Sequence, residues 1–245
     1  MEKRIKKQIS YGLLYLIIFS AIGAGIYFRV RQKTEITPPI LAPKDIEIIW
    51  ARQSMQPNTN ECDLVAQIKN PNPYHFATQI NYQFILYGLN NQIMSQIHGV
   101  SWILPNQAKY IIANEVVCSE LAGAETVSRI IFKTDQIQWE TYNEYHEPQI
   151  QIFQKDFQKL TQGPPYAQVS AIVANKNEFN LTNIKINIIL EDANNNLIAA
   201  RQTQIDNLVA NQETKISYQW LTEIKENVYR LTIEPDLPIT NDFLK

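Results

Sequence analysis

The chain has 245 residues, enough for one large domain or two small ones. Its formal net charge is −2, but residues 1–33 hold seven of the 22 basic side chains and one of the 24 acidic ones. The rest of the chain therefore has 15 basic and 23 acidic side chains, a net charge of −8. A body this acidic argues against nucleic acid as a partner, because nucleic-acid binding depends on Lys and Arg neutralising phosphates. It favours solubility or a basic partner.

An uncharged, apolar run covers residues 9–28 and follows a short basic tail, residues 1–8. A helix of about 20 residues crosses the hydrocarbon core of a membrane, so we predict a transmembrane helix that acts as an uncleaved signal anchor. The alternative is a cleaved signal peptide, but the apolar run continues past the small residues that would mark cleavage. Four cations precede the run and three follow it, which favours the N-terminus inside and the body outside the cytoplasm.

Residues 29–44 contain three prolines and cannot form a regular helix, so we predict a short extended stalk. Beyond it the chain runs one pattern twice, about a hundred residues apart. The first copy has AQIKN, INYQFILYGLNNQI and LPNQ; the second has AIVAN, IKINIILEDANNNL and LVANQ. The repeat predicts two modules, residues 45–139 and 148–237, with a joint at 140–147 and a tail at 238–245.

Each module reads as a set of short strands. The long alternating segment places Ile80, Tyr82, Phe84 and Leu86 on one face, and Ile184, Ile186, Ile188 and Leu190 are its equivalents in the second copy. Asn-rich turns follow both segments, as expected for hairpins. We therefore predict an all-β fold: two tandem Ig-like (fibronectin III-like) β-sandwiches.

The first copy resembles the signature of the FxLYD domain in Phe84, Leu86 and Tyr87, with Gly88 where that family has Asp. The second copy keeps Leu190 and Asp192 of the signature but lacks its aromatic residues. Asn70, with its equivalent Asn175, opens a turn that is similar to the water-stress (LEA-2, or WHy) domain, which is also a small β-sandwich. The LPNQ segment resembles the L-x-P-G-like turn of FxLYD domains, with Asn106 where Gly is expected. The resemblance implies a fold and says almost nothing about function, since likeness of fold does not establish a mechanism.

Cys62 and Cys118 are the two cysteines of the chain, and both fall in the first module. If the body lies outside the cytoplasm, they are candidates for a disulfide; two buried free thiols are the alternative. No CxxC motif, paired histidines, calcium loop or nucleophile with a base partner occurs, so we predict no metal, no cofactor and no catalytic residues.

Tyr74, Tyr142 and Tyr145 sit in polar, loop-like sequence and are candidates for an exposed contact surface. Together these features predict a noncatalytic, single-pass membrane protein whose extracytoplasmic body binds an unknown protein or glycan, or spaces another component from the membrane. The first alternative is a stress-protective protein of the LEA-2 kind. The second is an intracellular, membrane-tethered scaffold.

Overall fold

The computed structural model describes residues 16, 19–24, 42–56, 60–118, 127–141 and 148–237. The chain divides into two compact units, Met1–Ala42 and Pro43–Lys245. In the first unit, Leu16 and residues 19–24 are helical. Within the described residues, no helix is both long enough and apolar enough to span a membrane. The predicted transmembrane helix, residues 9–28, and the predicted stalk, residues 29–44, lie mostly outside the described residues.

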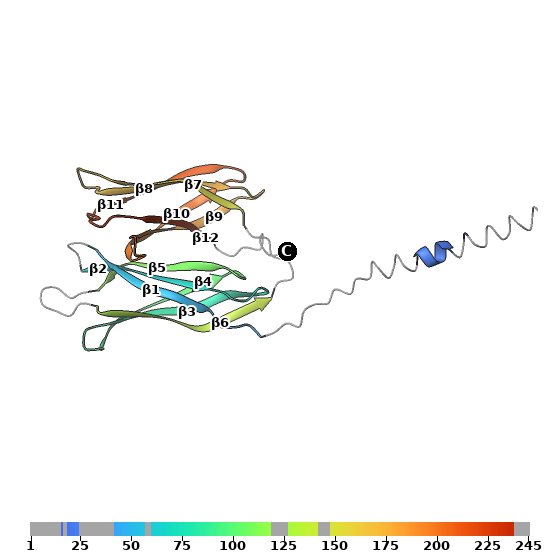
Figure 1. Ribbon diagram of the computed structural model, residues 1–245, viewed down its shortest axis with the longest axis horizontal. Helices are drawn as coiled ribbons and strands as arrows, with labels where there is room; N and C mark the ends of the chain where they lie inside the picture. Colours follow the sequence, from blue (N-terminus) through green and yellow to red (C-terminus); the bar gives the residue numbers. More distant parts are fainter. Residues whose placement is uncertain are drawn as a thin grey trace, which may run out of the picture. The chain divides into compact units, whose positions relative to one another are not determined.

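The second unit is built of antiparallel strands, twelve in its described residues (Figure 1). Those of the first half are β1 (Glu47–Met55), β2 (Glu61–Lys69), β3 (His75–Tyr87), β4 (Ile93–Ile103), β5 (Ala108–Val117) and β6 (Arg129–Thr141). Those of the second half are β7 (Ile150–Lys159), β8 (Ala167–Asn175), β9 (Leu181–Glu191), β10 (Leu197–Leu208), β11 (Glu213–Trp220) and β12 (Arg230–Asp236). The prediction of an all-β chain body is confirmed.

The two halves have the same topology. In the first half the sheets have the strand orders β1-β2-β5 and β4-β3-β6; in the second half the orders are β7-β8-β11 and β10-β9-β12. Adding six to each strand number converts one half into the other. The sequence repeat is therefore a repeat of the whole strand arrangement.

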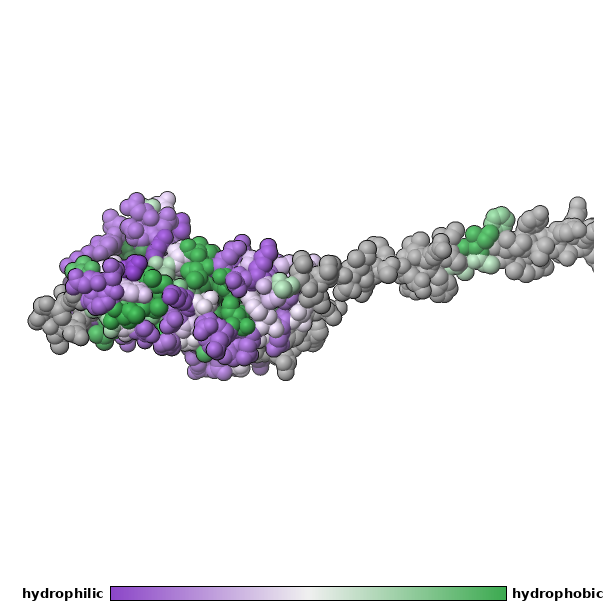
Figure 2. All heavy atoms as spheres, turned by 90° about the horizontal axis from the view of Figure 1, so that it is seen from below, coloured by the Kyte–Doolittle hydropathy of each residue, from purple (hydrophilic) through white to green (hydrophobic). Residues whose placement is uncertain are grey.

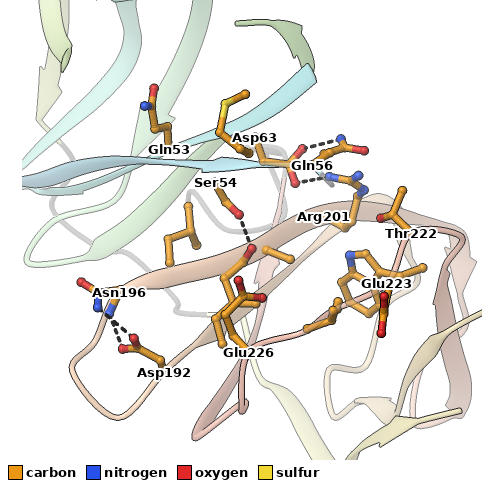
Figure 3. Close-up of a pocket in the computed structure, with 16 residues that line it drawn as sticks. Gln53, Ser54, Gln56, Asp63, Asp192, Asn196, Arg201, Thr222, Glu223 and Glu226 are labelled. Atoms are coloured by element: carbon orange, nitrogen blue, oxygen red, sulfur yellow. Dashed lines mark hydrogen bonds and ion pairs between the residues drawn. The ribbon is translucent and has the colours of Figure 1, made fainter. Parts of the chain in front are cut away.

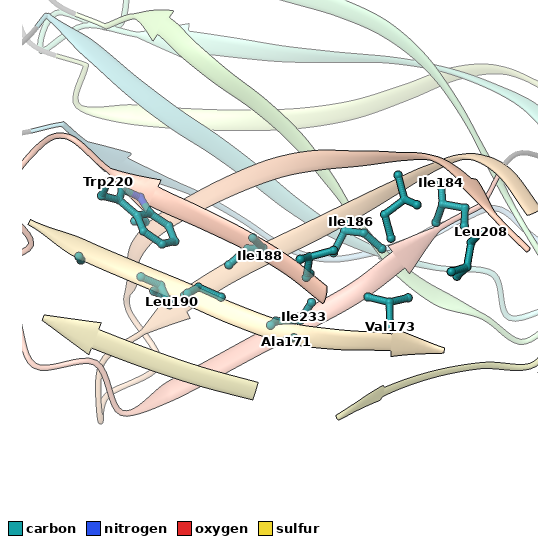
Figure 4. Packing of buried hydrophobic residues seen from close by; sticks show 14 of the residues in the cluster. Ala171, Val173, Ile184, Ile186, Ile188, Leu190, Leu208, Trp220 and Ile233 are labelled. Carbon is teal, nitrogen blue, oxygen red and sulfur yellow. The ribbon is translucent and has the colours of Figure 1, made fainter. Parts of the chain in front are cut away.

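Each half has its own core between its two sheets. In the first half, β2 contributes Leu64, Ala66 and Ile68, and β3 contributes Ile80, Phe84 and Leu86. In the second half, residues from β8, β9, β11 and β12 meet in the same way, as Figure 4 shows: Ala171, Val173, Ile184, Ile186, Ile188, Leu190, Trp220 and Ile233. Alternate residues of a strand point to one face, so these runs each supply one side of a core. The predicted inward faces of the two long segments are confirmed, with Tyr82 only partly buried.

The outer face of the β4-β3-β6 sheet mixes polar and apolar side chains. Ile93 and Val100 of β4 are exposed. In the strand register, Gln83 of β3 lies between His98 of β4 and Lys133 of β6. Figure 2, which views the molecule from the side of β3 and β6, shows apolar areas in green between hydrophilic areas in purple. A sheet with one face on a core and the other toward solvent has this mixed pattern.

The segment between the two halves is only partly described. β6 continues to Thr141, so the first two residues of the predicted joint (140–147) belong to a strand, and residues 142–147 lie outside the described part. The second half begins directly with strand β7, which extends from Ile150 to Lys159. The predicted tail, residues 238–245, also lies outside the described residues.

Candidate binding site between the two halves

The two halves contact each other through the outer faces of two sheets, β1-β2-β5 and β10-β9-β12. A small apolar cluster lies at this interface and consists of Val65 and Tyr110 from the first half with Ile189 and Ala200 from the second. Trp50, Ile112 and Leu197 pack against it. As a result, the central strands β2 and β9 are buried on both faces along much of their length.

Ion pairs surround the apolar cluster. Arg201 of the second half pairs with Asp63 of the first, and both side chains are almost completely buried. Lys109 Nζ lies 2.7 Å from Asp236 Oδ1, and Arg52 Nη1 lies 3.3 Å from Glu191 Oε1. In each pair the two partners come from different halves.

Hydrogen bonds from uncharged side chains satisfy further polar groups at the interface. Asn114 Nδ2 donates to the carbonyl oxygen of Ala200 at 2.9 Å and to Asp63 Oδ1 at 3.1 Å. Asn187 Nδ2 donates to the carbonyl oxygen of Tyr110 at 3.3 Å, and the Ser54 hydroxyl bonds the carbonyl oxygen of Ile198. Buried charges are tolerated where they are paired and hydrogen-bonded, so this interface has the chemistry of a fixed contact.

Burial at the interface shifts several pKa values. Desolvation lowers the pKa of the Lys109 ammonium, against the opposing effect of Asp236. Burial raises the pKa of the Glu234 carboxyl, and burial together with the charges of Glu234 and Glu191 raises the pKa of Tyr110 to about 12. The Lys109 ammonium also lies 4.0 Å from the centre of the Trp102 ring, a cation–π contact.

A cavity of about 330 Å³ lies beside this interface (Figure 3). The first half contributes the end of β1, Gln56 directly after it and Asp63 of β2. The second half contributes the β9–β10 turn, the start of β10, Trp220 and the segment that leads to β12. The lining residues are Gln53, Ser54, Met55, Gln56, Asp63, Asp192, Asn196, Leu197, Ile198, Ala199, Arg201, Trp220, Thr222, Glu223, Ile224 and Glu226.

The lining combines an acidic edge with one unpartnered donor. Figure 3 shows Asp63 and Arg201 paired on one wall, with Glu226 and Asp192 on the side of the second half. Glu223 and Glu226 are exposed, and no ion pair in the described part of the chain neutralises them. The Trp220 indole is 3% exposed, and among the described residues its Nε1–H has no hydrogen-bond partner.

The predicted family-motif residue Asn70 is a structural clamp at the end of β2. Its Nδ2 donates to the carbonyl oxygens of His75 at 2.8 Å and Leu104 at 3.0 Å. Its Oδ1 accepts from the backbone N–H of Asn72 at 3.0 Å and from Asn72 Nδ2 at 2.9 Å. The side chain is fully buried, and it ties together the two loops that follow β2 and β4.

Asn175 repeats this clamp in the second half. Its Nδ2 donates to the carbonyl oxygens of Phe179 at 2.8 Å and Leu208 at 3.0 Å, and its Oδ1 accepts from the backbone and side chain of Asn177. The turns that the two clamps hold contain Asn106 and Asn211, at φ 55° and 56°. Asn adopts this left-handed conformation more readily than most residues, which explains Asn at the place where Gly was expected.

The other motif residues also serve the fold. Phe84, Leu86 and Leu190 lie in the two cores. Tyr87 lies 4.7 Å from the guanidinium of Arg129, measured to the ring centre. Asp192 begins the β9–β10 turn, where hydrogen bonds from the side chain and backbone of Asn196 lower the pKa of its carboxyl. Of these residues, only Asp192 lines the cavity.

Cys62 and Cys118 form a disulfide in this structure, with Cα atoms 5.7 Å apart. That spacing lies in the usual range for disulfides. Cys62 belongs to β2 and Cys118 follows β5, so the bond fastens neighbouring strands of one sheet.

The structure describes one of the three predicted contact tyrosines. Tyr74 is 57% exposed in the turn before β3, while Tyr142 and Tyr145 lie outside the described part. Within the described residues, no cluster of three or more His, Cys, Asp or Glu side chains could hold a metal ion.

The interface and its cavity were missed by the sequence analysis, although one signal was present. Leu64-Val65-Ala66 and Ile188-Ile189-Leu190 are unbroken apolar runs, which are typical of strands buried on both faces. The cavity itself gives no such signal, because its lining comes together only when the two halves pack.

Comparison with known proteins does not identify a family for this chain. No model of a protein family matches the sequence, and no match is found among curated proteins. The crystal structure of red sea bream transglutaminase is similar with a TM-score of 0.24 and 10% sequence identity. That similarity covers 79% of this chain and 29% of the transglutaminase, and it is too weak to carry an argument.

Proposed function

We propose that this chain is a noncatalytic, single-pass membrane protein whose β-sheet body works outside the cytoplasm as an envelope binding or spacer module. The observation that carries the proposal is the ion-paired interface between the two halves. A contact that buries an apolar cluster and pairs Arg201 with Asp63 opposes hinge motion. A body of two joined sandwiches suits a rigid support that holds a binding surface away from a membrane.

The disulfide supports the extracytoplasmic placement of the body. Structural disulfides form and persist in oxidising compartments and are rare in the cytosol of most organisms. Cys62 and Cys118 are both buried, which is typical of a structural bond and not of an exposed, reactive pair. The apolar run at residues 9–28 supplies the membrane anchor of the proposal.

We also propose that each half is an Ig-like sandwich related to the FxLYD and LEA-2 (WHy) domains. The motif residues Phe84, Leu86 and Tyr87 of the first half carry the resemblance to those domains. The shared strand order, the two Asn clamps and the matching turns at Gly88–Asn91 and Asp192–Asn195 support one common fold for the two halves. Since the motif residues serve packing and turn formation, they favour no stress-protective activity over a binding role.

The side of the membrane on which the body lies is the direct test of the proposal. Spheroplasts of cells that produce the full chain would be treated with protease, and the redox state of Cys62 and Cys118 would be measured by thiol labelling before and after reduction. The proposal expects digestion of the body and thiols that become reactive only after reduction. A protected body with two reactive thiols would overturn it and favour the intracellular, membrane-tethered scaffold.

A further inference from the structure

We infer that two copies of this chain pair through the outer edge of strand β4, which joins their two β4-β3-β6 sheets into one continuous sheet. The partner is a second copy of the protein, and the pairing goes beyond the proposed envelope function. Three observations carry the inference. β4 has no Asp, Glu, Lys or Arg, its edge is uncovered among the described residues, and the opposite edge of the same sheet is protected.

The composition of β4 sets it apart from the other edge strands. Within the described residues, β4 pairs with β3 alone, so its other side is a sheet edge. Native proteins usually keep such edges from pairing with another chain by means of charged side chains, prolines or bulges. Every other edge strand in the described part of the chain has at least two charged residues. β4 has neither a charged residue nor a proline, and it pairs with β3 without a register shift from Ser95 to Ser101.

The equivalent edge of the second half is covered by the first half. In β10, Ala200 is fully buried, and its carbonyl oxygen accepts a hydrogen bond from Asn114 Nδ2 at 2.9 Å. The strand registers place Gln96 of β4 at the position of Ala200. Gln96 is exposed, and no side chain of the described residues donates to its carbonyl oxygen. Of the residues of β4 only Ile103 is buried, so an added strand has access to this edge.

The neutral edge suits a second copy of itself. In a contact with two-fold symmetry, residues near the axis face their own copies, so a charged residue there would oppose a like charge. β4 has no such residue. A two-fold axis at Ile97 places Gln96 of each copy opposite His98 of the other in an antiparallel pair. An amide and an imidazole at these positions can form a hydrogen bond, and the free backbone groups of the two strands bond each other.

The other edge of the sheet limits the assembly to two copies. Strand β6 has charged side chains at four positions: Arg129, Lys133, Asp135 and Glu140. Gln136 has a φ of 47° and is an extra residue in the pairing with β3, which makes a bulge. Charges and a bulge oppose the addition of a further strand. Pairing through β4 therefore uses the one neutral edge of the sheet and gives a closed dimer.

The oligomeric state of the full chain tests the inference. Sedimentation equilibrium in detergent micelles that match the density of the solvent reports the mass of the protein alone. We expect a reversible equilibrium between monomer and dimer, with no larger species. A monomer at every concentration, or oligomers that grow without limit, would overturn the inference.

Matched variants separate pairing through β4 from association of the predicted membrane helix. Val100→Lys adds a charge to the exposed edge of β4, and Gln204→Lys adds the same charge at the equivalent exposed position of β10. We expect the first variant to weaken the dimer about tenfold and the second to leave its dissociation constant almost unchanged. Equal effects of the two variants, including no effect of either, would show that the dimer does not form through β4.

Cross-linking locates the axis. Gln96→Cys and His98→Cys are prepared separately, mixed and mildly oxidised. Directly opposite residues of an antiparallel pair lie about 5 Å apart, within reach of a disulfide, so the mixture should cross-link faster than either variant alone. The absence of a cross-link in all three samples would again overturn the inference. The side of the membrane on which the body lies does not enter these tests, so the dimer and the envelope function stand or fall separately.

Discussion

At the scale of single residues, the clearest result is that one side chain, Asn, closes each half in the same way. An Asn side chain has two N–H donors and one acceptor oxygen, and both Asn70 and Asn175 use all of them within the protein. Asp would lack the donors, and Leu would lack all polar groups. The geometry therefore explains why Asn stands at the end of the equivalent strands β2 and β8.

Replacing either clamp should destabilise the protein strongly. Asn70→Ala or Asn175→Ala leaves two carbonyl oxygens and the donors of a neighbouring Asn without their partner, so we expect a loss of about 2–4 kcal/mol in the free energy of unfolding. Urea denaturation measures the loss. Asn194→Ala, at an exposed turn position, is the control and should change the free energy by less than about 0.5 kcal/mol. A clamp variant as stable as this control would contradict the structural role.

Glu234 gives a prediction about pH. Burial raises the pKa of its carboxyl above the ordinary value of 4.5, so the folded state binds the proton more tightly than the unfolded state does. Stability is therefore lost as the pH rises through the interval between the two pKa values. Glu234→Gln removes this titration and should raise the Tm at pH 7 but give no comparable gain near pH 4.

Scanning calorimetry at both pH values tests the pH prediction. Glu178→Gln, at an exposed position, is the control and should show no gain at either pH. A gain from Glu234→Gln that is equal at pH 4 and pH 7 would exclude burial of the carboxylate as its cause.

At the scale of strands, burial on both faces separates β2 and β9 from their neighbours. Each has one face in the core of its half and the other in the interface. The alternating pattern correctly predicted the strands and their inward residues, because a core selects every second side chain. It could not predict the interface. Ala200 and Ile189 are neighbours in one sheet, and Val65 and Ile112 are neighbours in the other. The alternating pattern of each strand does not show that these two pairs pack against each other.

The site was less predictable than the fold. Asp63, Glu191 and Arg201 read in the sequence as ordinary polar strand residues, but in the structure all three are buried with charged partners. Local sequence carries the signals for strands and turns. The partner of a buried charge is 138 residues away in the case of Asp63 and Arg201, and only the packing of the two halves brings it close.

The disulfide stabilises one sheet of the first half. Closing a loop of 56 residues should contribute about 3–4 kcal/mol, so Cys62→Ala with Cys118→Ala should lower the free energy of unfolding by about that amount. Reduction of the natural protein should give a similar loss. The double variant also serves as the control for the reductant, which should not change its stability. The prediction would be contradicted if the natural protein were equally stable with and without reductant.

At the scale of the whole molecule, the interface should make the two halves unfold together. Ile189 is fully buried against the first half, and Ile189→Asp would place a charge in the apolar cluster. We expect the natural protein to show one calorimetric transition and the variant two. Ile186→Val, a change in the core of the second half, should lower the Tm while keeping one transition. Two transitions in the natural protein would show that the interface does not couple the halves.

The interface joins unlike faces: the β1-β2-β5 sheet of one half meets the sheet of the other half that corresponds to β4-β3-β6. A head-to-tail contact of this kind does not close on itself, so the same rule could add copies without end and give a filament. The register places Ser170, Lys215 and Ser217 at the positions that Val65, Tyr110 and Ile112 occupy in the first half. We expect these polar side chains to oppose a further copy of the same contact. Replacing all three with the apolar residues of the first half (Ser170→Val, Lys215→Tyr and Ser217→Ile) should make the protein self-associate. Sedimentation velocity would then reveal growing oligomers.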